Sequence, residues 1–392
     1  MTAGEFTYRL PATAALLFRG LAILGGVTLV AGLFLTPQRT WINVLLVSYY
    51  LVGLGLGGLL LVALHYVTGA RWSVPLRRVP EAMTAVLPLA AAGLAAVLLC
   101  RPSLYSWSVP NSPGGSESPL QHLWLNRPFF LFRSFTYLAV WMAFAVVIVR
   151  NSHRQDRDHD TAPTENNIRL SAGFLVVFGV TCWLASYDWI MSLEPEWAST
   201  IFGVYNFAGL FLSGLAAEVL LVIWLRRHSP LQAVLNDDRL HDLGTLLFAF
   251  SSFWMYTWFC QYLLIWYVNN PEETAYFRRR WHGNWPTLLF LDLTLNWAIP
   301  FLVLLFRSAK RSPLVLGTVA MVVLAGRWVD LSLMVLPSQD VVDTVPLPGL
   351  IEVGLSLGAA GLFALAVSRG LSKASLLPLH EPIGSNEGHA TA

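Results

Sequence analysis

Residues 41–68 read WINVLLVSYYLVGLGLGGLLLVALHYVT, an apolar run that contains no Asp, Glu, Lys or Arg. A helix of about 20 apolar residues crosses the roughly 30 Å hydrocarbon core of a bilayer, so this run is long enough to span a membrane. Similar runs recur from residue 15 to residue 370. Of the 392 residues, 55% are hydrophobic and 12% are charged, whereas soluble domains average about 25% charged residues. The sequence therefore predicts an all-α, polytopic integral membrane protein.

The apolar runs predict about ten transmembrane helices in packed bundles. Pro-, Gly- and Ser-rich connections separate them, the longest being 101–127, and the polar segment 150–167 is predicted to be a solvated break. Residues 1–370 form the predicted transmembrane domain, and residues 371–392 are predicted to be a mobile cytoplasmic tail. The predicted helices are 15–36, 41–68, 82–100, 128–149, 168–192, 197–225, 240–269, 284–306, 312–336 and 348–369.

Lys and Arg are distributed unequally between the two predicted sides of the membrane. Sixteen lie on one side, six on the other, and three fall inside helices. Because cytoplasmic loops carry the excess of basic residues, the richer side is predicted to be cytoplasmic. Both termini then lie in the cytoplasm, which agrees with an even number of helices.

Composition and motifs exclude several classes of function. A net charge of +2, with basic residues spread over many segment ends, does not indicate a nucleic-acid partner. The three cysteines stand singly in apolar segments, so the sequence predicts no haem attachment, iron–sulfur or other metal site. The stretch GLGLGG (53–58) matches a dinucleotide-binding pattern, but that pattern requires a strand, a turn and a helix. Inside a helix, Gly53 and Gly57 instead predict close helix packing.

Ionisable and amide side chains inside the predicted helices are the candidate functional residues. Each charge costs at least about 2.5 kcal/mol near the bilayer centre unless it is paired or hydrated. With the predicted orientation, a set of these residues shares one depth in the outer half of the membrane. They predict an outer pocket for an amphipathic ligand with a polar head, such as a quinone, whose protons a nearby carboxylate accepts. The set consists of Asp188, Gln261, Asp292, Asn296, Arg327 and Asp330, with Thr257 one turn before Gln261.

Structural roles compete with this interpretation. Arg327 and Asp330 are spaced i,i+3 on one helix, which also suits a structural ion pair. Thr257 is able to bond back to a carbonyl of its own helix. For Asp188 there are three alternatives: a proton acceptor at the water-facing edge of the pocket, a structural partner of Arg327, or a carboxylate held by another Arg or amide.

Two further pairs lie outside this set. Glu194 and Glu196 follow Asp188 on an outer turn, where they are predicted to be solvated. His65 and Glu218 lie in the cytoplasmic halves of their helices and are candidates for an inner proton path, since both side chains exchange protons. His65 alternatively hydrogen-bonds a neighbour near its helix end.

The stretch SYDWIMSLEPEWASTIFGVYNFAG (186–209) resembles the quinone-binding membrane subunits of alternative complex III, a bacterial quinol:cytochrome c oxidoreductase. These subunits are similar to the polysulfide-reductase membrane anchors (the NrfD-like superfamily). Further similarities to the same family run through nearly the whole chain in order. They are HYVTGARWSVPLRRVPEAM (65–83), WLNRPFFLFRSFTYLAVW (124–141), FCQYLLIWYVNNPEETAYFRRRW (259–281), IPFLVLLFRSAKRSP (299–313) and GRWVDLSLMVLP (326–337).

The resemblance implies the second, smaller quinone subunit of such a complex, a multi-pass protein of the bacterial inner membrane. It implies bundles of transmembrane helices, a quinone pocket near the outer face, menaquinone or ubiquinone as the ligand and no covalently bound cofactor. The implied partners are a homologous larger quinone-binding membrane subunit, an iron–sulfur protein and multihaem cytochromes c, which receive the electrons. The chain alone is then not expected to be catalytic.

At one position the chain departs from the family pattern. The family often has His where Asn296 stands, and Asn does not take up a proton. Two alternative functions remain beside the redox subunit: a secondary transporter and a purely structural membrane anchor. No pair of Gly- or Pro-broken helices in matching halves favours the transporter. Solute transport in liposomes separates the transporter from the other two, and binding of a quinone analogue separates those two from each other.

Overall fold

The computed structural model describes residues 8–109, 119–158, 162–229, 231, 235–338 and 349–376. In these ranges every regular element is a helix, and ten helical spans are long and apolar enough to cross a membrane. This confirms the predicted all-α membrane fold. The spans are α1 (Ala12–Leu35), α2 (Pro37–Thr68), α3 (Arg78–Met83) continuing through η3 (Thr84–Val86) into α4 (Leu87–Cys100), α6 (Arg127–Asp158), α7 (Ala162–Trp189), α8 (Phe202–His228), α9 (Asp237–Val268), α11 (Trp285–Leu293) continuing through η8 (Thr294–Ala298) into α12 (Ile299–Leu304), α14 (Pro313–Val335) and α15 (Leu350–Leu371).

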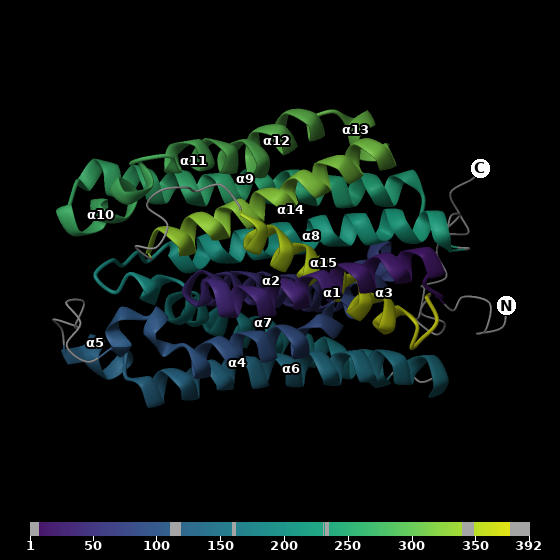
Figure 1. Ribbon diagram of the computed structural model, residues 1–392. Helices are drawn as coiled ribbons and strands as arrows, with labels where there is room; N and C mark the ends of the chain where they lie inside the picture. Colours follow the sequence, from purple (N-terminus) through teal and green to yellow (C-terminus); the bar gives the residue numbers. More distant parts are fainter. Residues whose placement is uncertain are drawn as a thin grey trace.

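Short helices join these spans at the two ends of the bundle (Figure 1). We call the end where α1 begins and α15 ends the inner end, and the opposite end the outer end; the sequence predicts that the inner end faces the cytoplasm. At the outer end lie η4 (Pro102–Leu104), η5 (Ser106–Ser108), α5 (Pro119–Trp124), η6 (Met191–Leu193), α10 (Pro271–Arg280) and η9 (Leu336–Ser338). At the inner end lie η2 (Arg71–Leu76) and α13 (Arg307–Arg311).

Local sequence fixes several helix boundaries. Pro37 and Pro313 stand at the first positions of α2 and α14, where a missing backbone N–H costs nothing. Gly69 ends α2 in the left-handed conformation, at φ 60°, which Gly adopts without strain. Asn236 caps α9, because its side chain accepts a hydrogen bond from the backbone N–H of Arg239.

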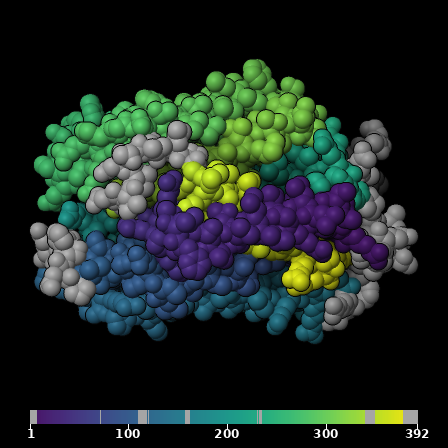
Figure 2. All heavy atoms as spheres, in the orientation of Figure 1, coloured from purple at the N-terminus to yellow at the C-terminus, as the bar shows by residue number. Residues whose placement is uncertain are grey.

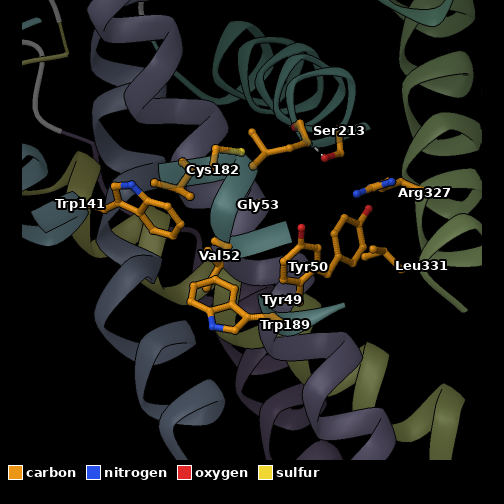
Figure 3. A pocket seen from close by; sticks show the side chains of 13 residues that line it. Tyr49, Tyr50, Val52, Gly53, Trp141, Cys182, Trp189, Ser213, Arg327 and Leu331 are labelled. Atoms are coloured by element: carbon orange, nitrogen blue, oxygen red, sulfur yellow. Dashed lines mark hydrogen bonds between the residues drawn. The ribbon is translucent and has the colours of Figure 1, made fainter. Parts of the chain in front are cut away.

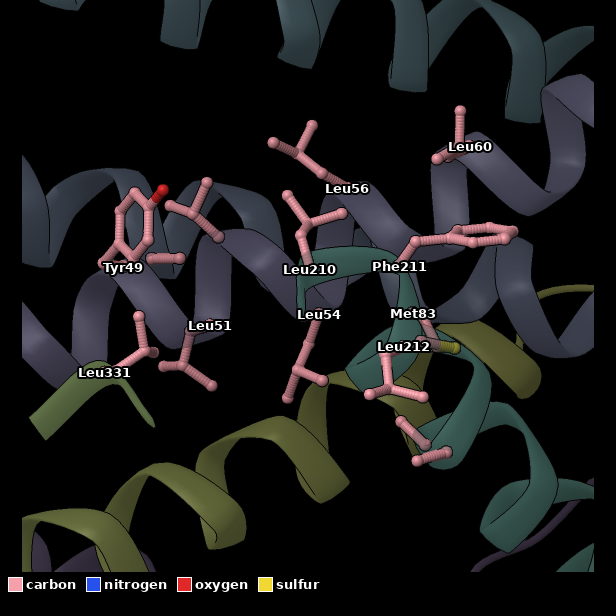
Figure 4. Packing of buried hydrophobic residues seen from close by; sticks show 14 of the residues in the cluster. Tyr49, Leu51, Leu54, Leu56, Leu60, Met83, Leu210, Phe211, Leu212 and Leu331 are labelled. Carbon is pink, nitrogen blue, oxygen red and sulfur yellow. The ribbon is translucent and has the colours of Figure 1, made fainter. Parts of the chain in front are cut away.

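Helices α2 and α8 form the centre of the bundle. In an apolar stretch of 18 residues in each helix, 78% of the residues are buried, whereas the corresponding share in α1 is 11%. They run parallel, and Leu54, Leu56 and Leu210 belong to the packed core around them (Figure 4). A Cβ at Gly57 would lie 2.8 Å from the Cα of Gly214, so the two backbones touch where glycine faces glycine. The predicted role in close packing is confirmed for Gly57. A Cβ at Gly53 would meet only the side chain of Leu210, at 3.7 Å, so no backbone approaches there.

The polar segment 150–167 differs from the prediction of a solvated break. Helix α6 continues to Asp158 and α7 begins at Ala162, so both helices extend beyond their apolar parts. Cross-links between the helices explain the extension: Asn151 donates to Asn167, which donates to the carbonyl of Ile148, and Thr164 donates to Gln155. These hydrogen bonds hold the polar ends of α6 and α7 together.

Helices α1 and α15 pack against each other on the surface of the bundle (Figure 2). Gly25 lies on the backbone of Gly358, and Gly354 lies against Thr28, so the two helices are antiparallel. Beyond α15, Leu376 is buried in the core. The remainder of the predicted cytoplasmic tail, 377–392, lies outside the described residues.

Candidate functional site

The centre of the candidate site is a buried ion pair on α14. Arg327 donates to Asp330 one turn further along the same helix, and both side chains are almost fully buried. Tyr205 also donates to Asp330, and the indole of Trp254 donates to its other oxygen at 3.3 Å. The second terminal nitrogen of Arg327 donates to Asn206 at 3.3 Å. The predicted pair therefore forms, and side chains from α8 and α9 complete it.

Asp292 and Asn296 lie beside this pair on the eighth span. Asn296 Nδ2 donates to Asp292 Oδ1 at 2.7 Å, as the i,i+4 spacing predicts, while Asn296 Oδ1 has no partner among the described residues. Asp292 lies within electrostatic range of both Asp330 and Arg327. Asn296, which holds Asp292, also lies against Gly326, the residue before Arg327, so the two buried carboxylates and the buried guanidinium belong to one cluster.

The backbone at Asn296 forms a π-helical turn, η8, and Pro300 explains part of it. Pro300 has no N–H to donate to the carbonyl four residues earlier, which is that of Asn296. That carbonyl instead accepts from Ser251 Oγ of α9 at 2.7 Å. Gly326 of α14 lies against the Asn296 side chain, where a Cβ would be 2.8 Å from Nδ2. Such turns occur often at functional sites because they turn a side chain out of register.

Asp188 belongs to a different cluster. Its oxygens accept from Arg133 Nε at 3.0 Å, Arg133 Nη2 at 2.8 Å, Trp124 Nε1 at 2.9 Å and Tyr137 at 3.1 Å. The side chain is 0% exposed, so the prediction of a carboxylate at the water-facing edge is wrong. The partner is Arg133 of α6 rather than Arg327. Of the alternatives considered, a carboxylate held by a neighbouring helix's Arg agrees with these contacts.

A small cavity lies between the two clusters (Figure 3). Trp189 contacts both Tyr137 and Tyr49, each with ring centroids 6.2 Å apart. Tyr49 donates to Asn206 at 3.3 Å, and Arg327 donates to the same oxygen. Between these side chains about 20 Å³ is open to the centre of a water molecule. That is room for one or two waters.

Thr257 and Gln261 complete the predicted outer set. Thr257 donates to the carbonyl of Trp254 in its own helix at 2.8 Å, which is the structural alternative considered for it. Gln261 is buried, with 4% of its surface exposed, one turn further along α9. Both lie on the buried face of the helix that also carries Trp254.

The outer turn is covered by α10. Glu194 accepts from Arg280 at 2.8 Å and from Arg279 at 3.2 Å and is 9% exposed, so the expectation of a solvated Glu194 is wrong. Glu196 is exposed, as predicted. The guanidinium of Arg280 lies 3.3 Å above the ring of Tyr276. Burial raises the pKa of the Tyr276 hydroxyl above its ordinary value.

His65 and Glu218 do not meet. His65 lies edge-on to Trp72, with ring centroids 5.6 Å apart, and its Nδ1 has no hydrogen-bond partner among the described residues. Glu218 is 0% exposed, and neither of its carboxylate oxygens has a hydrogen-bond partner in the same part of the chain. No hydrogen bond or ion pair joins these two described side chains. They occupy the inner halves of adjacent helices without forming a continuous path.

Several residues of the site were not predicted from the sequence. Arg133 is the clearest case, because it is an arginine inside an apolar segment, as Arg327 is. Its position near the outer start of α6 matches the depth of Asp188, so pairing intramembrane arginines with aspartates by depth would have found it. Tyr205 and Asn206 carry no comparable signal, since a lone Tyr or Asn in a span gives no information on which way it faces.

The chain was compared with models of protein families and with curated proteins. No family model matches it. No curated protein matches it either. Among the described residues, no three His, Cys, Asp or Glu side chains are grouped as a metal ion would require.

Proposed function

We propose that the chain is a membrane subunit of a quinol:cytochrome c oxidoreductase complex of the alternative complex III type, and that its part is to take up and pass on protons. The observation that supports this most is the cluster of Asp292, Asp330 and Arg327, buried inside a helical membrane bundle. Ionisable groups at this depth are costly and are found mainly where ions, protons or substrates pass. The resemblance of residues 186–209 to quinone-binding subunits supplies the redox context.

Charge balance indicates how the cluster would act. Two ionised carboxylates beside one guanidinium leave one negative charge unbalanced in an apolar surrounding, and uptake of a single proton removes it. Tyr205, which donates to Asp330, and Asn296, which donates to Asp292, hold both carboxylates in place while the charge changes. The cluster is thus suited to hold one proton that quinol oxidation releases elsewhere in the complex.

The side chains beside Arg327 do not enclose a cavity large enough for a quinone. The cavity bounded by Tyr49, Trp189 and Arg327 leaves about 20 Å³ for the centre of a water molecule, whereas pockets for ligands of that size measure about 300–1,000 Å³. We therefore assign no step to a quinone, menaquinone or ubiquinone, held between Tyr49, Trp189 and Arg327. Water in this cavity would connect Arg327 with the aromatic side chains beside Asp188.

A purely structural anchor is the second candidate, and one observation favours it. Asp188 accepts four hydrogen bonds, two of them from the arginine that neutralises its charge. A carboxylate saturated in this way fixes α5, α6 and α7 to one another and has no lone pair left for a proton from a substrate. The proton-handling proposal therefore rests on Asp292 and Asp330 and not on Asp188.

The proposal is tested on the complex that co-purifies with this chain from native membranes. We expect an iron–sulfur protein, a multihaem cytochrome and a larger homologous membrane subunit to co-purify. Asp292→Asn keeps an oxygen for the Asn296 amide, so the complex should assemble. Its quinol:cytochrome c turnover should fall by about 10²–10⁴-fold, the usual contribution of one proton-transfer group.

The matched control is Glu196→Gln, which removes an exposed carboxylate at the outer turn and should leave turnover unchanged. Wild-type turnover in Asp292→Asn would exclude the proton role and leave the structural anchor. Purification without any haem-containing partner would contradict the redox assignment. Solute uptake by the chain alone in liposomes would establish the transporter instead.

A further inference from the structure

A large cavity lies at the inner end of the bundle, on the opposite side of the membrane from the proposed proton site. The centre of a water molecule can occupy about 490 Å³ of this cavity, compared with about 20 Å³ of the cavity beside Arg327. Its walls come from three segments that are distant in the sequence: α3 with the start of α4, the second half of α6, and the chain around the end of α15. It is the size of a ligand pocket.

The base of this cavity is polar and fixed. Arg78, which is 4% exposed, donates to Glu81 at 2.7 Å and to Ser152 at 3.0 Å, and its other terminal nitrogen donates to Asp156. His153 Nε2 lies 3.9 Å from the same oxygen of Glu81. These bonds join α3 to α6, so the polar base does not depend on an added ligand to hold its shape.

The rim of the cavity is cationic on one side and apolar on the other. Arg150 and Lys373 are both exposed and both line it, one from α6 and one from the chain that follows α15. With the groups of the base, they leave the cavity with one net positive charge before His153 is counted. Pro88 and Val146, on the faces of α4 and α6, line the apolar side and are also exposed.

We propose that this cavity binds one anionic phospholipid of the adjacent leaflet. The phosphate lies between Arg150 and Lys373, and an acyl chain follows the apolar side past Val146. Basic pockets between helices near the membrane surface bind anionic head groups in this way. A zwitterionic head group brings its own cation to the two side chains and is bound less well, and a neutral ring compound makes no use of them. The site is independent of the proposed redox function.

The lipid would join two parts of the chain that are distant in the sequence. Lys373 follows α15, whereas Arg150 belongs to α6, and one phosphate contacting both ties the last described helix to the body of the bundle. Arg78, at the base of the cavity, holds α3 against α6 through its bonds to Glu81 and Asp156. Loss of the lipid should loosen the segment after α15 without affecting the outer site.

The test uses the full-length protein, purified from native membranes with the subunits that it retains and then stripped of lipid. Native mass spectrometry measures binding of added phosphatidylglycerol, phosphatidylcholine and inorganic phosphate. We expect phosphatidylglycerol to bind more tightly than phosphatidylcholine. Arg150→Gln combined with Lys373→Gln should weaken its binding by about 25-fold, because each basic side chain near a membrane surface contributes roughly fivefold.

Two matched variants sharpen the result. Arg169→Gln with Arg307→Gln removes two exposed charges from the same end but away from the cavity, and should leave phosphatidylglycerol binding unchanged. Val146→Trp keeps every charge and fills the apolar side of the cavity, so it should weaken phosphatidylglycerol binding. Equal binding by wild type and the Arg150/Lys373 variant, or equal loss in the control pair, would overturn the proposal. So would binding of inorganic phosphate as tight as that of the lipid, or recovery of a quinone from the cavity.

Discussion

Replacing Asp188 with Asn tests whether this carboxylate is a structural partner or a proton acceptor. Each oxygen of Asp188 accepts two hydrogen bonds: Oδ1 from Trp124 and Arg133 Nη2, and Oδ2 from Tyr137 and Arg133 Nε. Whichever oxygen becomes the amide nitrogen, two donors then face a donor. Arg133, which is 6% exposed, also loses its counter-charge.

Breaking a buried ion pair in this way typically costs about 3–5 kcal/mol. Because folded proteins are stable by about 5–15 kcal/mol, this cost should visibly lower the amount of assembled protein. The measurement is the free energy of unfolding in mixed micelles, together with the amount of complex in the membrane. Combining Asp188→Asn with Arg133→Gln leaves no unpaired charge and should recover about 0.5–3 kcal/mol of the loss.

Two results would refute this reasoning. If Asp188→Asn unfolded at the same denaturant concentration as wild type, the ion pair would contribute nothing to stability. If the variant assembled normally but oxidised quinol about 10²–10⁴-fold more slowly, Asp188 would be a proton acceptor despite its four hydrogen bonds. Glu196→Gln, which alters an exposed carboxylate nearby, is the control and should shift stability by no more than about 0.5 kcal/mol.

Further predictions concern other parts of the molecule. Gly57→Ala should lower the free energy of unfolding by about 1–3 kcal/mol, because its Cβ would lie 2.8 Å from Gly214, whereas Gly173→Ala, with no neighbouring atom within 4 Å, should not. A reporter fused after Ala392 should be active only in the cytoplasm. Activity on the other side of the membrane would show that the predicted orientation is wrong. Glu218→Gln should leave the protein at least as stable, since the carboxylate that it removes has no hydrogen-bond partner among the described residues; unchanged proton release in the reconstituted complex would exclude an inner path through this residue.

The helices could be predicted from the sequence because hydropathy alone determines where a chain crosses a bilayer. The Arg327–Asp330 and Asp292–Asn296 contacts could be predicted as well, since residues three or four apart share a helix face whatever surrounds it. Asp188 shows the limit of this approach. Its depth was evident, but its partner depends on how α6 and α7 are rotated about their axes, and one sequence contains no measure of that rotation.

Glu194 shows a second limit. Nothing in SLEPEW indicates that a helix more than 70 residues later will fold back over the turn and cover it. A loop outside the membrane is therefore harder to place than a span, because no bilayer restricts where it lies. The prediction for segment 150–167 was wrong for the same reason. Its polarity indicated that the chain leaves the bilayer there, but not that α6 and α7 remain helical beyond it.

The contact of Gly25 with Gly358 has a consequence for how the protein is made. More than 300 residues separate the two glycines, so at about 5–20 residues per second the ribosome needs at least about 15 s to reach the second after making the first. Throughout that time α1 is already inserted in the bilayer, and its glycine face has only lipid or the insertion machinery against it. A nascent chain that stops before α15 keeps that face open permanently. Incomplete chains thus differ from finished ones in a feature that membrane quality control is able to recognise.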